Sequence, residues 1–140
     1  MGNKIAGRDE IFQYAKERFG TEPEYLWRSF PNHAILRNAN NQKWYAIIMD
    51  VPKEKLGFKG AERVDVLNVK CDPVMIGSLL MNDGYLPAYH MHKGRWISII
   101  LNGSIPPDEI FWLLNISYSI TAKEPKKKQI RRKKSYDRYR

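Results

Sequence analysis

The sequence has a single cysteine, Cys71, and no apolar run long enough to cross a bilayer. One cysteine excludes an intramolecular disulfide and any metal site built from several cysteines. A membrane-spanning helix needs roughly 18 consecutive apolar residues, and the chain does not open with a signal-peptide pattern. We therefore expect a protein of a reducing compartment, cytoplasmic and not inserted into a membrane.

Catalytic motifs are also lacking. The sequence has no glycine-rich phosphate loop and no nucleophile with a partnering base. Lys70 beside Cys71 would favour a reactive thiolate, but a cysteine between a strand and a helix start at Asp72 is more often a small buried residue. His90 and His92 would share one face of a strand, yet they lack a third metal ligand. We expect no enzyme, no cofactor and no metal.

Positive charge is present in excess but is unevenly distributed. Of the 24 Lys and Arg residues, ten lie in residues 123–140, together with two of the 15 acidic residues. This segment therefore has a net charge of +8, and the other 122 residues have a net charge of +1. Its single aliphatic residue, Ile130, cannot offset the entropy cost of ordering the segment. We predict a folded domain at residues 1–122 and a basic, disordered tail at residues 123–140.

Hydrophobic periodicity and turn residues divide the domain into helices and strands. Apolar residues in helical spacing predict a helix over residues 8–19 that ends at Gly20. Asp72-Pro73 and Pro106-Pro107 predict the starts of two further helices, the last of which runs to about residue 122. The predicted strands span residues 34–38, 43–51, 63–69, 86–91 and 95–101. The order α-β-β-β-α-β-β-α predicts a two-layer α+β fold, with an antiparallel sheet and helices on one side.

Several phrases of the second half resemble the MmcQ/YjbR family. They are residues 69–73 (Val-Lys-Cys-Asp-Pro), residues 87–93 (Pro-Ala-Tyr-His-Met-His-Lys), Trp96, residues 103–106 (Gly-Ser-Ile-Pro) and the Ser117-Tyr118 pair. The resemblance covers roughly residues 8–123, and His92 stands where the family commonly has asparagine. It implies a fold shared with secretion-chaperone-like proteins. It also implies a DNA-binding role, which is attributed to the family by likeness to a double-wing domain.

Two groups of residues are candidates for binding nucleic acid. In the domain, an aromatic and basic cluster on the last predicted hairpin would act as a wing against phosphates and bases. Its residues are Lys70, His90, Lys93, Arg95 and Trp96. The alternative is that Trp96 belongs to the core and that the charges are simply solvated. In the tail, the candidates for largely non-specific phosphate contacts are Lys126, Lys127, Lys128, Arg131, Arg132, Lys133 and Lys134.

The sequence therefore predicts a non-enzymatic protein that binds nucleic acid, DNA rather than RNA. A tail of this composition is also compatible with a role in solubility or with attraction to anionic lipid or RNA. The alternative function is a protein-interaction or chaperone-like module without a nucleic-acid role. Phe111 and Trp112 are adjacent on the last predicted helix, so both can hardly point inward, and one of them would be available to a protein partner or a homodimer.

Overall fold

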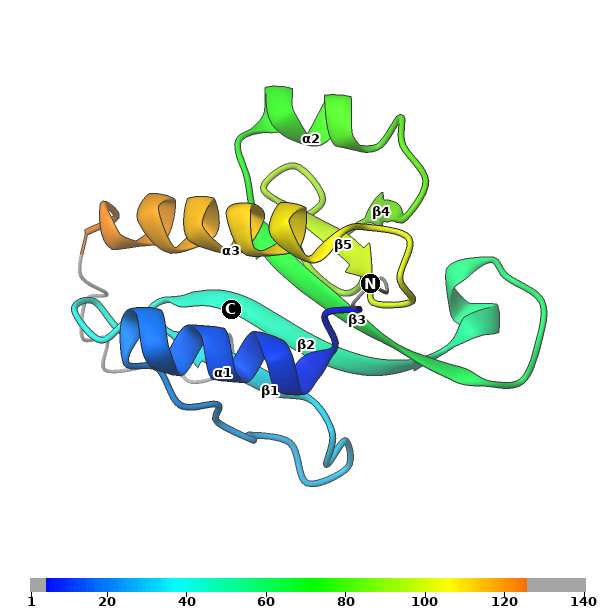
Figure 1. Cartoon of the computed structure of the whole chain (residues 1–140), viewed down its shortest axis with the longest axis horizontal. Coiled ribbons are helices and arrows are strands. Elements are labelled where there is room, and N and C mark those ends of the chain that lie inside the picture. Colours follow the sequence, from blue (N-terminus) through cyan, green and yellow to red (C-terminus); the bar gives the residue numbers. More distant parts are fainter. Residues whose placement is uncertain (1–4, 126–140) are drawn as a thin grey trace, which may run out of the picture.

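The computed structural model describes residues 5–125, which form three α-helices and a five-stranded sheet (Figure 1). In chain order the elements are α1 (Arg8–Phe19), β1 (Ala34–Arg37), β2 (Trp44–Pro52), the 3-10 helix η1 (Lys53–Leu56), β3 (Arg63–Lys70), α2 (Pro73–Leu79), β4 (Tyr85–Pro87), β5 (Trp96–Ile100) and α3 (Pro107–Ala122). The predicted α+β class and the predicted order of helices and strands are confirmed.

The sheet has the strand order β1-β2-β3-β5-β4, and each pair of neighbours is antiparallel. Helices α1 and α3 lie side by side across one face of it (Figure 1). Aromatic rings join the two helices: Tyr14 stacks on Phe111 with ring centroids 4.4 Å apart, and Phe19 stacks on Tyr118 at 4.0 Å. The result is a helical layer over a single sheet.

The two faces of the sheet carry separate hydrophobic cores. The first core lies between helices and sheet and includes residues from all three helices, such as Ile11, Ile76 and Leu113. The second core lies on the opposite face and is covered by loop residues such as Trp27 and Tyr89 and by Leu56 of η1. Successive side chains of β3 point alternately into the two cores, with Leu67 in the first and Val66 in the second. The alternating pattern of its sequence predicts this.

Helix ends follow the local chemistry that the sequence indicates. Gly20 ends α1 in the left-handed conformation, with φ of 69°, which glycine adopts without steric cost. The carboxylate of Asp72 accepts hydrogen bonds from the backbone N–H groups of Val74 and Met75 and so caps α2. Asp72 is thus a helix cap, as predicted. Within residues 5–125, no helix is long and apolar enough to cross a membrane.

The strand predicted over residues 86–91 is wrong in its length, because β4 ends at Pro87. Side chains bind the backbone groups that follow: Ser98 Oγ accepts from the N–H of Tyr89 at 2.9 Å, and Asn68 Nδ2 donates to the carbonyl of Tyr89 at 3.0 Å. His90 has a φ of 59° and turns the chain away from the strand direction. His90 and His92 therefore lie in a loop and do not share a strand face.

Candidate nucleic-acid interface

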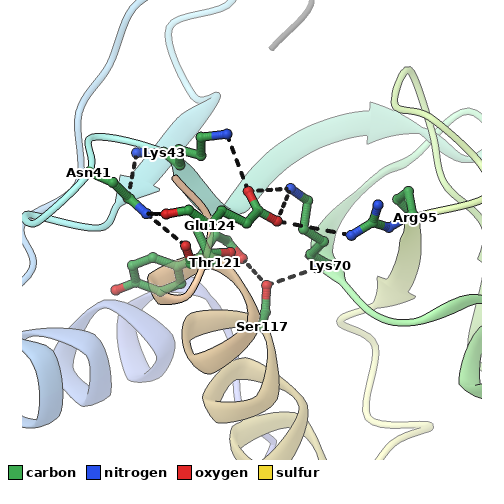
Figure 2. Close-up of polar contacts among 8 residues, drawn as sticks. Asn41, Lys43, Lys70, Arg95, Ser117, Thr121 and Glu124 are labelled. Atoms are coloured by element: carbon green, nitrogen blue, oxygen red, sulfur yellow. Dashed lines mark hydrogen bonds and ion pairs between the residues drawn. The ribbon is translucent and has the colours of Figure 1, made fainter. Parts of the chain in front are cut away.

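Residues of the predicted wing meet at one end of the sheet. Lys70 ends β3 and is the register partner of Trp96, which begins β5. Arg95 lies just before Trp96. Glu124, two residues beyond the end of α3, reaches the same place (Figure 2). Segments from the middle and the end of the chain are thus brought together here.

The carboxylate of Glu124 is held by three cations. Lys70 Nζ lies 2.9 and 3.2 Å from its two oxygens, Lys43 Nζ lies 3.5 Å away, and Arg95 Nη2 lies 4.0 Å away. We call Glu124, Lys43, Lys70 and Arg95 the Glu124 cluster. With one carboxylate among three cations, the cluster has a formal charge of +2. The Glu124 side chain is only 18% exposed, so these charges are screened less than surface pairs are.

Asn41 fixes the backbone next to this cluster. Its Nδ2 donates to the carbonyls of Thr121 at 2.7 Å and Glu124 at 3.1 Å, and its Oδ1 accepts from the N–H of Lys43 (Figure 2). The last carbonyls of a helix have no hydrogen-bond partner within the helix. The Asn41 side chain supplies a donor for one of them, the carbonyl of Thr121. Ordered contacts therefore extend to Glu124, beyond the domain boundary that we expected at residue 122.

Ser117 links α3 to the two central strands. Its Oγ donates to the carbonyl of Tyr45 at 2.6 Å and accepts from the N–H of Lys70 at 2.8 Å, and the residue has no exposed surface. The β2–β3 ladder ends beside it, at the pair Ala46–Val69. The hydroxyl thus continues the connection between β2 and β3 where strand pairing stops.

Replacing Ser117 with alanine should remove both hydrogen bonds and leave the buried carbonyl of Tyr45 and the partly buried N–H of Lys70 without this partner. We expect a loss of about 2 kcal/mol in the free energy of unfolding, since an unsatisfied buried group costs about 1–3 kcal/mol. Urea unfolding followed by circular dichroism measures this. Ser119→Ala is the matched control on the same helix, because Ser119 is exposed. Equal effects of the two substitutions would contradict the assigned role of Ser117.

The Glu124 cluster should make stability depend on pH. Burial disfavours the ionised Glu124 carboxylate, but the hydrogen bond from Lys70 and the charges of Lys70 and Lys43 outweigh this and hold its pKa below the ordinary value of 4.5. A carboxyl group with a lowered folded-state pKa stabilises the fold above its unfolded pKa, and this stabilisation is lost as the pH falls through the folded pKa.

Glu124→Gln should therefore lower the free energy of unfolding by about 1–2 kcal/mol at pH 7. The difference from the unchanged protein should shrink as the pH drops below about 4.5. Denaturant unfolding at pH 7, 5 and 3 measures it. Glu62→Gln is the control, because Glu62 pairs with Lys53 at 3.5 Å in solvent, where such pairs contribute little. A Glu124 effect that is independent of pH would contradict this assignment.

The structure separates the predicted wing residues into two kinds. Trp96 is only 6% exposed and packs in the second core, and Lys70 Nζ lies 5.5 Å from its ring centroid. The alternative interpretation of Trp96 as a core residue agrees with this placement. His90, Lys93 and Arg95 are exposed, although the ammonium group of Lys93 donates to the carbonyl of Ala88 at 2.9 Å.

Cys71 is fully buried in the first core. Burial, with a smaller contribution from Asp72, raises the pKa of its thiol to about 11. The thiolate that a nucleophile requires is therefore disfavoured at neutral pH. In residues 5–125, no three His, Cys, Asp or Glu side chains lie together as a metal site would need.

The tail candidates from Lys126 to Lys134 lie outside the described residues, as does the predicted disorder of residues 126–140. Sequence reasoning missed Asn41, Lys43 and Glu124 as partners in one cluster. One signal was available: Glu124 is one of only two acidic residues in the basic segment. An isolated acid beside many cations is a candidate for a specific ion pair.

An antiparallel five-stranded sheet with helices packed on one face defines a small α+β domain. The family model described as YjbR matches residues 17–120, and the chain belongs to the YjbR family. The basic segment begins beyond the matched region, so conclusions about it depend on the charge of this chain alone.

Relatives agree with this assignment. The uncharacterized protein YyaQ of Bacillus subtilis is 45% identical over 114 residues, which are 81% of this chain and 97% of the relative. A crystal structure of a Pseudomonas syringae protein has a TM-score of 0.80 and 42% identity, over 82% of this chain and 98% of that one. Deinococcus radiodurans protein DR2400 shares the fold, with a TM-score of 0.64 at 18% identity over 83% of this chain and 78% of its own.

Proposed function

We propose that this protein is a cytoplasmic, non-enzymatic nucleic-acid-binding protein whose basic C-terminal segment makes largely non-specific contacts with phosphates. One observation carries the proposal: residues 123–140 have a net charge of +8, whereas the remaining 122 residues have +1. Each phosphate that a cation neutralises releases condensed counterions, which favours binding without sequence preference. DNA is preferred to RNA on the strength of the family resemblance.

The Glu124 cluster supports the proposal through its position. It holds the chain at Glu124, directly before the run of basic residues, and itself has a formal charge of +2 from its four residues. Arg95 is 50% exposed there and Lys43 31% exposed. A phosphate backbone bound by the segment would therefore meet positive rather than negative charge on the adjoining surface.

The direct test is a titration of the full-length protein with a fluorescein-labelled 20-base-pair duplex and the matching single strand. If about six phosphates are contacted, the association constant should fall roughly a thousandfold between 50 and 200 mM salt. Scrambling the DNA sequence should leave the affinity within about twofold. Failure to bind either DNA at 50 mM salt would reject the proposal.

A second candidate function is a protein-interaction module. Phe111 packs against Tyr14, whereas its neighbour Trp112 is 52% exposed. Ile116 and Ile120 follow Trp112 at intervals of four and, with it, line a shallow hollow on α3. This helical strip suits a second copy of the chain as partner.

Sedimentation velocity of the protein and of Trp112→Ser tests this candidate. Dimers that dissociate in the variant would support it, and a monomer at all concentrations up to about 100 µM would reject a dimer. Capture from lysate with and without nuclease separates the two functions. Partners lost on nuclease treatment are bound through nucleic acid, and partners that remain are bound by the protein itself.

A further inference from the structure

The face of the sheet opposite the helices contains a cavity of about 540 Å³. Ile47, Met49 and Val51, which alternate along β2, form its floor and are almost fully buried. Its walls come from the segment before β1 and from the loop after β4. We call this cavity the β2 pocket. Its volume is in the usual range for sites that bind small molecules.

Aromatic rings dominate the walls of the β2 pocket. Trp27 meets Trp44 edge to face with ring centroids 5.8 Å apart, and Phe30 stacks on His33 at 4.8 Å. Phe30 is itself 51% exposed, although a large apolar side chain of a soluble protein is more stable when covered. Flat rings that are fixed in position present surfaces on which another planar ring system packs well.

The charged groups at the pocket leave one cation available. Asp50 is engaged, because Arg63 Nε donates to its carboxylate at 2.9 Å and Asn32 Nδ2 donates at 3.1 Å. Lys55 also lines the pocket, and its ammonium group has no hydrogen bond or ion pair to any residue in 5–125. Lys55, Arg63 and Asp50 together have a formal charge of +1. An anionic group is therefore complementary to this pocket.

His33 adds a neutral polar group to the wall. Desolvation on burial lowers its pKa, against the opposing effect of the Asp50 backbone carbonyl, so the imidazole is uncharged at neutral pH. His90 also lines the pocket, and its φ of 59° is a conformation that non-glycine residues seldom adopt. Such local strain is often found where a loop is shaped around a ligand.

We propose that the β2 pocket binds a small planar aromatic molecule with one anionic group, its rings against Trp27, Phe30 and Trp44 and its anion beside Lys55. A hydrophobic cavity with a few polar groups at its edge is the usual form of a small-molecule site. The inference does not depend on the basic segment, so it stands or fails separately from nucleic-acid binding.

The probes are 1-naphthoate, 1-naphthyl phosphate and the uncharged 1-naphthalenemethanol, titrated into the full-length protein. Calorimetry gives the affinities, and two-dimensional NMR follows the indole N–H signals. Both anionic probes should bind about tenfold more tightly than the alcohol. The signals of Trp27 and Trp44 should shift, and that of Trp112 should not. The relative strength of the carboxylate and the phosphate shows which anion the site prefers.

Two pairs of variants locate the binding. Phe30→Ala should weaken the binding of all three probes about tenfold. Lys55→Gln should lower the affinity of the two anionic probes to that of the alcohol. Phe58→Ala and Lys59→Gln are the matched controls, since both residues are exposed and line a different cavity. The proposal is overturned if no probe binds at millimolar concentration, or if the control substitutions lower the affinity as much as Phe30→Ala and Lys55→Gln do. It is also overturned if the Trp27 and Trp44 signals shift with single-stranded DNA but not with the naphthalene probes.

Discussion

Replacing Trp96 with alanine is expected to lower the free energy of unfolding by about 3–5 kcal/mol, as truncation of a buried tryptophan usually does. Trp96 is 6% exposed in the second core. Its ring also faces Lys70, whose ammonium group is bound to Glu124. The substitution therefore removes side-chain volume from the second core. It also removes the ring that packs against Lys70 of the Glu124 cluster.

Urea unfolding of Trp96→Ala measures the loss, with Trp112→Ala as the matched control. Trp112 is 52% exposed, so its truncation should cost under about 1 kcal/mol. Trp96→Phe keeps an aromatic core residue and allows a binding test on folded protein. The affinity of the Trp96→Phe variant for single-stranded DNA should stay within about twofold of that of the unchanged protein. A loss of tenfold or more would show that Trp96 stacks on bases, as the wing hypothesis requires.

A chain that ends at Pro125 is expected to lose nearly all affinity for DNA. It lacks nine of the 24 basic residues and keeps Glu124 with its three cations. If about six of the missing residues contact phosphates, the association constant at 50 mM salt should fall by a factor of a thousand or more. Fluorescence anisotropy with the labelled duplex measures the change.

The shortened chain should remain folded, because the contacts of Asn41 and Ser117 all lie before residue 126. Thermal unfolding within about 3 °C of the full-length protein is the control. A second control restores the charge with the same residues of the segment in shuffled order, which should recover the affinity because phosphate contacts of this kind carry no sequence information. Recovery only by the native order would show specific contacts instead.

Much of the fold could be predicted because local chemistry and periodicity agree with it. Helix α1 has the predicted bounds of residues 8–19, and the Asp72-Pro73 step caps α2 as expected. Strand β4 was predicted too long because residues 88–91 are apolar and aromatic. The backbone N–H and carbonyl of Tyr89 bind the side chains of Ser98 and Asn68 instead. This competition depends on residues of other strands and cannot be seen in the sequence of the segment itself.

The site was harder to predict because its members are distant in sequence. Lys70 and Glu124 are 54 residues apart, and Asn41 and Glu124 are 83 apart. Composition assigned Glu124 to the tail, whereas its ion pairs join it to the domain. The β2 pocket was missed for a related reason: Trp27, Phe30 and His33 lie in a segment without periodicity, and their common wall exists only after they fold over β2.

The salt dependence of DNA binding tests the central claim most directly, because it counts the phosphate contacts that each part of the chain makes. The logarithm of the association constant, plotted against the logarithm of the salt concentration, should have a slope of about −5 for the full-length protein and between 0 and −1 for the chain ending at Pro125. Equal slopes for the two proteins would place the contacts on the folded domain and contradict the account.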